Sequence, residues 1–175
     1  MNAGEQRRVL GIDPGLAYVG WGVIAQDSRA GAGRASFRLI DCGCLQTTTN
    51  MPHAERLLHV FHGLGAVIAK HRPTAAAVEE VFQGKSPKSA LLAGEGRGAC
   101  ILAAATHDLT VVEYPATVVK QAVTGNGRAV KQQVQSMVQR LLALDELPTP
   151  HHAADALAIA ITHLQRGPRS GVVRG

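Results

Sequence analysis

Three acidic residues stand at the ends of the buried elements that the sequence predicts. Asp13 follows an apolar run at residues 9–12, Glu79 follows a second run at 74–78, and Asp155 lies in the first turn of an alanine-rich helix. Side chains at element ends can converge on one cleft. Their carboxylates would repel one another without divalent cations, and two cations roughly 3.5–4 Å apart can activate water and stabilise a departing 3′ oxygen. The pattern therefore predicts metal-dependent hydrolysis of a phosphodiester bond.

His152 stands three residues before Asp155, and residues three apart on a helix project from the same face. For this pair alone, an acidic residue that complements the helix dipole is the stronger explanation. The combination with Asp13 and Glu79 favours a metal site instead. Carboxylate and water oxygens suit Mg²⁺, of which we expect two ions per site, and an imidazole would make Mn²⁺ acceptable as well.

The elements that would position these residues begin with three strand-like runs, at 9–12, 18–25 and 37–45. Turn residues separate the runs, which predicts an antiparallel meander. Short strands at 74–78 and 109–112 then alternate with helical patterns at 52–71 and 88–105, and a further helical pattern after Pro115 is interrupted at 124–128 and resumes at 130–144. The last helix begins after Pro148. We expect Asn50 and Thr149 to cap the first and last helices, with Pro150 at the first position of the latter.

Size and charge limit the function classes. A chain of 175 residues fits one domain with one core, predicted at residues 8–165, and residues 166–175 read as a basic flexible tail. The net charge of +5 favours a polyanionic partner, although such an excess can also serve solubility alone. The composition therefore permits a nucleic-acid enzyme without proving one.

The cysteines and the hydropathy pattern point to the cytoplasm. Cys42, Cys44 and Cys100 are odd in number and lack zinc-finger spacing, so we expect reduced thiols. No uninterrupted apolar stretch approaches the ~20 residues of a membrane span, and only eight residues precede the first apolar run. We expect a protein that is neither membrane-bound nor exported.

Several separated motifs resemble the RuvC family of Holliday junction resolvases. They include G-I-D-P-G at 11–15, V-E-E-V-F at 78–82 and H-A-A-D-A-L-A-I-A-I-T-H at 152–163. The similarity runs from about residue 8 to residue 163 in consistent order and spacing, including S-A-L-L-A-G-E-G-R-G and V-K-Q-A-V-T-G-N-G. Three motifs in the right order are far more specific than any one of them.

The resemblance implies a ribonuclease H-like α/β fold, with a five-stranded mixed sheet flanked by helices. It also implies a homodimer that resolves four-way DNA junctions by paired nicks in strands of like polarity and works with the RuvA and RuvB branch-migration proteins. Asp13, Glu79 and Asp155 match family catalytic carboxylates. His152 falls where many members carry a fourth acidic residue, so its role as metal ligand or proton shuttle stays open.

DNA contacts are expected around the same cleft. Phe82 stands in a polar loop, where its ring could stack on a base or simply anchor the loop, and the resemblance favours stacking. Lys120 and Lys131 match family lysines that contact phosphates, although most lysines are only solvated. Lys85 is a further candidate for phosphate contact.

Two other function classes remain open from the residues. The segment G-I-D-P-G is also similar to the phosphate loop of actin-like nucleotide phosphotransferases, but those enzymes need two such domains and this chain has room for one. A junction-binding module without chemistry would use the same basic surface, with His152 breaking the acidic set. Measurable ATP hydrolysis would favour the first class, and junction binding without nicks would favour the second.

Overall fold

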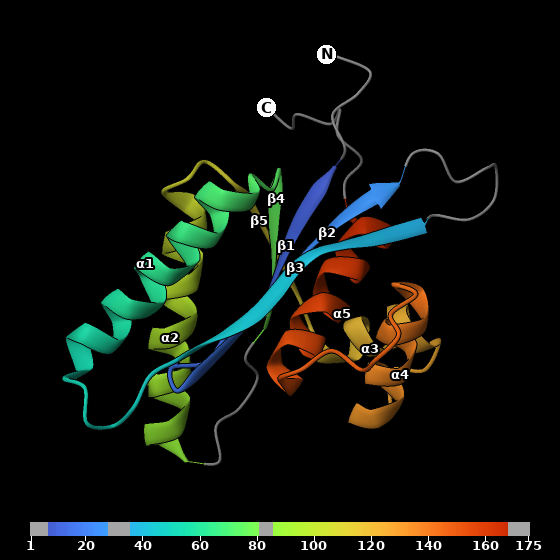
Figure 1. The fold of residues 1–175 in the computed structure, drawn as a ribbon. Helices are drawn as coiled ribbons and strands as arrows, with labels where there is room; N and C mark the ends of the chain where they lie inside the picture. The colour runs from blue at the N-terminus through green and yellow to red at the C-terminus, as the bar shows by residue number, and fades with distance from the viewer. Residues whose placement is uncertain (1–6, 28–35, 81–85, 168–175) are drawn as a thin grey trace, which may run out of the picture.

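The computed structural model describes residues 7–27, 36–80 and 86–167 (Figure 1). Its elements follow one another as strands, then alternating helices and strands, then helices. In chain order they are β1 (Arg8–Asp13), β2 (Tyr18–Asp27), β3 (Ser36–Gln46), α1 (His53–His71), β4 (Ala75–Glu79), α2 (Pro87–Ala105), β5 (Thr110–Tyr114), α3 (Ala116–Thr124), α4 (Lys131–Leu141) and α5 (His151–Arg166).

One mixed sheet forms the middle layer, with the strand order β3-β2-β1-β4-β5. The pairs β1–β2 and β2–β3 are antiparallel, whereas β1–β4 and β4–β5 are parallel. Helices α1 and α2 cover one face of the sheet, and α3, α4 and α5 cover the other (Figure 1). This arrangement confirms the ribonuclease H-like fold, including the antiparallel meander that the three N-terminal runs predicted.

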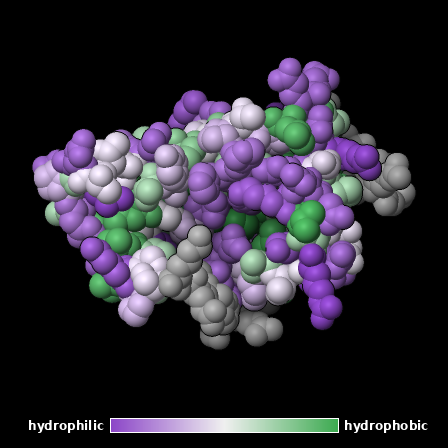
Figure 2. Space-filling view, turned by 90° about the horizontal axis from the view of Figure 1, so that it is seen from below, coloured by the Kyte–Doolittle hydropathy of each residue, from purple (hydrophilic) through white to green (hydrophobic). Residues whose placement is uncertain are grey.

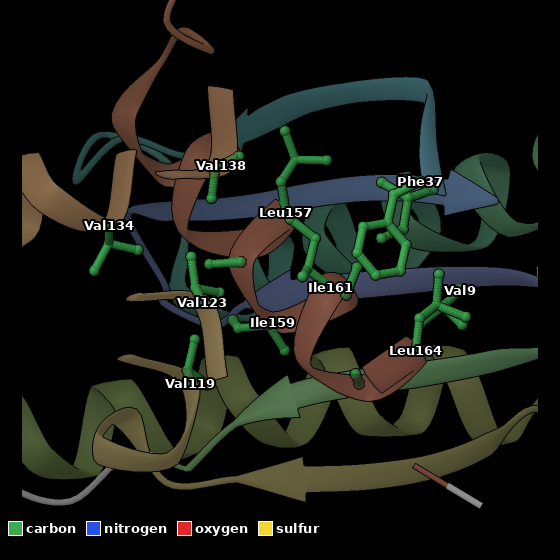
Figure 3. Close-up of a cluster of buried hydrophobic side chains, with 14 of the residues drawn as sticks. Val9, Phe37, Val119, Val123, Val134, Val138, Leu157, Ile159, Ile161 and Leu164 are labelled. Carbon is green, nitrogen blue, oxygen red and sulfur yellow. The ribbon is translucent and has the colours of Figure 1, made fainter. Parts of the chain in front are cut away.

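Alternation along β1 divides the apolar side chains between two cores. Leu10 and Ile12 are fully buried on the side of α1 and α2, whereas Val9 packs on the side of α5. Figure 3 shows the second core, in which Leu157, Ile159 and Ile161 of α5 meet side chains from the sheet and from α3 and α4. Helix α5 is therefore buried along most of its length and is held firmly over the sheet.

Three glycines on the sheet let α5 lie unusually close to β1 and β2. A Cβ atom at Gly11 would lie 2.0 Å from the carbonyl oxygen of Ala156, and one at Gly20 would lie 1.9 Å from that of His152. At Gly22 an added Cβ would meet the side chain of Leu157 at 2.6 Å. Because real Cβ atoms do not approach backbone atoms this closely, glycine is required at Gly11 and Gly20 for this packing, whereas a side chain at position 22 would require the Leu157 side chain to shift.

The helix starts differ from the sequence expectations. Pro52 and Pro150 are the N-cap residues of α1 and α5, and neither has a side chain that can accept the capping hydrogen bond. The expected caps at Asn50 and Thr149 are therefore wrong, because each helix begins one or two residues later than these positions require. Pro150 stands at the N-cap and not at the first helical position.

The C-terminal ends of α4 and α5 also differ from the sequence expectations. Helix α4 stops at Leu141, earlier than expected, and the chain then turns through Ala143 with a φ of 50°. Helix α5 continues to Arg166, so the first residue of the predicted tail is helical, while residues 168–175 lie outside the described part. Among the described residues no helix is both long and apolar enough to cross a membrane.

Candidate active site

The sheet brings Asp13 and Glu79 to the same edge. Strands β1 and β4 are parallel neighbours, and their last paired residues are Ile12 and Val78. Asp13 and Glu79 are the next residues of the two strands and therefore lie at neighbouring strand ends. Gly11 faces α5, and Asp13, two residues further along the strand, faces the same way.

The first turn of α5 carries the other two predicted residues to this edge. Ligand atoms of Asp13, His152 and Asp155 all lie within 4.8 Å of one another. The Nδ1 atom of His152 lies 2.8 Å from Oδ2 of Asp13, so an Nδ1–H donates to the carboxylate. This hydrogen bond raises the pKa of His152, partly opposed by burial of the ring. Glu79 is not part of this close group, but it lines the same cleft as Asp155.

Burial and negative neighbours make Glu79 an unusual carboxyl group. Its pKa is raised to about 7, first by burial and then by the charges of Asp13 and Asp155, against the opposing effect of Lys120 and Lys131. Burial likewise raises the pKa of Asp155. Clustered carboxyl groups with raised pKa values are typical of functional sites, because burying their charges costs stability and serves no packing purpose.

Lys120 and Lys131 line the cleft together with Glu79 and Asp155. The cleft has a volume of about 270 Å³, and apolar side chains such as Val119 form part of its lining. Lys131 Nζ lies 2.6 Å from Oδ2 of Asp155 and partly neutralises it. Seen from this end, the surface is mostly hydrophilic around a hollow with hydrophobic residues at its base (Figure 2).

The donor set fits divalent cations. Two carboxylates and an imidazole lie within 4.8 Å of one another, and the carboxylate of Glu79 lines the same cleft. Together they offer the oxygen-rich coordination that Mg²⁺ prefers and the nitrogen that Mn²⁺ tolerates. The raised pKa values of Glu79 and Asp155 also favour cation binding, because a cation beside these groups would stabilise their charged forms. Asp13, Glu79, His152 and Asp155 are thus the residues that could hold metal.

The structure brings together six of the eight residues singled out from the sequence, namely Asp13, Glu79, Lys120, Lys131, His152 and Asp155. Phe82 and Lys85 lie outside the described residues. Sequence reasoning missed Tyr18, whose ring stacks on His152. The available signal was its position, as one of only two tyrosines, three residues beyond the turn that follows Asp13.

Comparison with known proteins identifies the family. The family model "Crossover junction endodeoxyribonuclease RuvC" matches residues 9–163. The RuvC protein of Chloroflexus aggregans is 48% identical over 161 residues, which cover 92% of this chain and 94% of the relative. The structure of Thermus thermophilus RuvC superposes with a TM-score of 0.81 at 39% identity, covering 90% of this chain and 93% of that one. The same protein in complex with Holliday junction substrate gives a TM-score of 0.83 at 37% identity and the same coverage. The chain belongs to the RuvC family of crossover junction endodeoxyribonucleases.

Proposed function

We propose that this protein is a Holliday junction resolvase, a hydrolytic endonuclease that cuts four-way DNA junctions with paired nicks in strands of like polarity. Membership of the RuvC family and the similarity to a RuvC structure bound to Holliday junction substrate support this function. The single observation that carries it is the convergence of Asp13, His152 and Asp155 within 4.8 Å, beside a cleft lined by Glu79.

The site residues divide the work of hydrolysis. Bound divalent cations, two Mg²⁺ ions in this proposal with Mn²⁺ as an alternative, supply the Lewis acidity that activates the attacking water and stabilises the departing 3′ oxygen. Asp13 on β1 and Asp155 on α5 would hold these cations beside the scissile phosphate. Glu79, whose pKa is about 7 in the metal-free protein, would lose its proton beside a cation and would then hold that cation as a carboxylate ligand.

His152 gives the site less negative charge than a fourth carboxylate would. Its Nδ1–H is engaged with Asp13, which leaves the lone pair of Nε2 as the ring's only ligand or proton acceptor when the imidazole is neutral. A role on Nε2 is compatible with both metal binding and proton transfer. In either role His152 acts through an atom that faces away from its hydrogen bond to Asp13.

The two lysines of the cleft are proposed to hold the DNA backbone. Lys131 pairs with Asp155 in the free protein, and Lys120 lies near enough to Glu79 to lower its pKa. An approaching phosphate would attract both ammonium groups, and at Lys131 it would compete with the carboxylate of Asp155. Stacking of Phe82 on a base and phosphate contact by Lys85 belong to the same proposal and rest on the family resemblance.

A homodimer would place two such sites on one junction, as two paired nicks require. Leu91 and Leu102 support this assembly, because they lie three turns apart on one side of α2 and are 64% and 56% exposed. We expect RuvA and RuvB as further partners by family membership. Three free cysteines, Cys42, Cys44 and Cys100, fit action in the reducing cytoplasm.

A synthetic four-way junction tests the function. Incubated with Mg²⁺ or Mn²⁺, the wild-type protein should produce paired nicks, whereas Asp13→Asn and Glu79→Gln should bind the junction and leave it intact. These substitutions keep the side-chain shape and remove the charge. Binding without nicks by all three proteins would show a junction-binding module in place of a nuclease.

A further inference from the structure

Tyr18 lies against the one site residue whose role the family pattern leaves open. Its ring stacks on the imidazole of His152, with ring centroids 5.3 Å apart and an angle of 9° between the planes. Near-parallel rings at this separation attract one another as offset-stacked aromatic pairs do. His152 is 38% exposed at its side chain, so without Tyr18 one face of the imidazole would be open to water.

The sheet holds Tyr18 in this place from two sides. Tyr18 is the first residue of β2 and pairs with Gln46 of β3, whose Nε2 donates to the tyrosine hydroxyl at 3.2 Å. Gly20, two residues along β2, faces the same side, and its missing side chain makes the room in which the first turn of α5 lies. The stacked pair thus follows from strand register and helix position.

Two contacts together fix the orientation of the imidazole. Tyr18 sets the plane of the ring, and the hydrogen bond from Nδ1 to Asp13 selects which edge faces the carboxylate. Rotation of the ring by half a turn would place a carbon where Nδ1 now donates, and tilting it would break the stack. Nε2 is therefore presented in one direction, which is what a ligand or a proton acceptor requires.

We propose that Tyr18 is a positioning residue for junction cleavage, acting through His152 and not through DNA. The inference rests on the proposed nuclease function. Tyr18 belongs to neither of the two buried apolar clusters and is 45% exposed, so it contributes little to the core. A ring kept at the surface beside the site is explained by its contact with His152.

The first test uses the metal-free protein and does not depend on activity. Proton resonances of the His152 ring, identified among the eight histidines by their loss in His152→Ala, should lie upfield in the wild type because the tyrosine ring shields them. Tyr18→Ala should remove the upfield shift, and Tyr18→Phe should restore it. Identical His152 resonances in wild type and Tyr18→Ala would overturn the proposal.

The second test measures coupling between the two residues. Tyr18→Ala should lower the single-turnover rate of junction cutting roughly tenfold while the junction Kd stays within about twofold. In a His152→Ala background the same change should alter the residual rate by less than about twofold, because the ring that Tyr18 orients is gone. Tyr18→Phe should recover the wild-type rate.

Three outcomes would count against the positioning role. Equal rate losses in both backgrounds would show that Tyr18 acts independently of His152, and a weakened junction Kd with an unchanged rate would show a DNA contact. A fall in melting temperature that accounts for the whole rate loss would show a structural role. If the wild-type protein itself does not cut junctions, the proposed function fails. The His152 resonances would still show whether Tyr18 stacks on His152.

Discussion

At the scale of single residues, the balance between negative and positive charges in the cleft should set the affinity of the proposed site for metal. Asp13, Glu79 and Asp155 supply three negative charges at most, and Lys120 and Lys131 compensate part of that charge from the same cleft. Replacing a fourth carboxylate by His152 removes Coulomb attraction for a cation and adds a nitrogen ligand. The consequence is a site in which metal affinity should depend strongly on the residue at position 152.

Changing His152→Asp should retain or raise Mg²⁺-dependent cutting, because the carboxylate adds charge and a hard oxygen ligand. His152→Ala should lower the rate about 100-fold. Both rates are measured on a four-way junction across a series of Mg²⁺ and Mn²⁺ concentrations. Complete loss of activity in His152→Asp with either metal would contradict a simple ligand role and favour proton transfer.

Glu79 should lose a proton when metal binds. Its pKa of about 7 in the free protein means that the carboxyl group is about half protonated at pH 7 and loses the proton beside a cation. Calorimetric titration with Mg²⁺ in two buffers of different ionisation enthalpy should therefore report release of roughly half a proton at pH 7 and less at pH 8.5. The control Glu79→Gln should release correspondingly less, and equal release would disprove the assignment.

Stability of the metal-free protein should respond to the same group. The folded-state pKa of Glu79 is raised above its ordinary value of 4.5, so its contribution is present below pH 4.5 and is lost as pH rises through about 7. Urea unfolding without metal should show this loss in the wild type and not in Glu79→Gln. A difference between the two proteins that does not change with pH would contradict the raised pKa.

The proposed site residues could be singled out from the sequence because Asp13, Glu79 and Asp155 lie at the ends of apolar elements and fall in motifs that resemble one family. Periodicity placed them at the ends of elements, and the family resemblance supplied their proposed roles. The role of Tyr18 could not be predicted, because its partner depends on the pairing of β2 with β3 and on the depth at which α5 lies. Neither the strand pairing nor the depth of α5 can be predicted from the local sequence.

At the scale of elements, α5 connects stability with catalysis. It carries His152 and Asp155 at its first turns, and glycines on β1 and β2 allow its backbone to lie directly on the sheet. Sequence patterns predicted an alanine-rich helix that begins after Pro148. They did not predict the glycine contacts, because a glycine in a strand is equally compatible with a bulge or a bend.

Gly11→Ala should therefore disturb both properties. The added methyl group would meet the Ala156 carbonyl oxygen at 2.0 Å, so α5 must move, and we expect a loss of roughly 1–3 kcal/mol together with most of the cutting activity. Gly65→Ala on α1 is the matched control, since an added Cβ would meet only the His107 side chain, at 3.2 Å, and it should be clearly more stable than Gly11→Ala. Equal stability of the two variants in urea unfolding would contradict the close packing.

His163, near the C-terminal end of α5, should make the stability of the protein sensitive to acid. His163 is 1% exposed, its Nδ1 lies 3.1 Å from the Tyr114 hydroxyl and its Nε2 lies 3.3 Å from the Arg7 guanidinium. Burial, and secondly the charge of Arg7, lower the pKa of His163 to about 4. The folded protein keeps this ring neutral while the unfolded chain protonates it near pH 6.5, so its contribution is present above pH 6.5 and is lost as pH falls toward 4.

Between pH 7 and pH 5 this group should cost about 2 kcal/mol of unfolding free energy. Urea unfolding of the wild type and of His163→Gln at both pH values isolates the effect, since the variant cannot take up that proton. The variant should lose less stability over this interval. An equal loss in both proteins would show that His163 does not titrate as its burial requires.

At the scale of the whole molecule, one domain supplies one cutting site, and paired nicks require two. The fold class could be predicted from the family resemblance, with which the order of the predicted elements agrees, whereas the single domain remains a prediction. The assembly could not be derived from periodicity alone, because an apolar residue on a helix does not reveal whether it faces its own sheet or a partner. Leu91 and Leu102 are exposed in the folded chain and so do not face its own sheet, which is why we propose them for the dimer contact.

Leu91→Glu combined with Leu102→Glu should convert the dimer to a monomer of 18.4 kDa, because charges would be buried without partners at the contact between the two helices. Sedimentation equilibrium measures the mass. Leu147→Glu, at a leucine that is 47% exposed in the segment before α5, is the control and should remain dimeric. An unchanged mass in the double variant would place the interface elsewhere.

Asp13, Glu79, His152 and Asp155 are proposed to hold the cations that DNA hydrolysis requires. Anomalous scattering from crystals soaked in Mn²⁺ tests this proposal most directly, since the signal locates each ion without reference to activity. We expect peaks within about 2.5 Å of carboxylate oxygens of Asp13 and Asp155, and their loss in Asp13→Asn. Ordered Mn²⁺ at other residues, with no peak between β1 and α5, would contradict this assignment of the metal ligands.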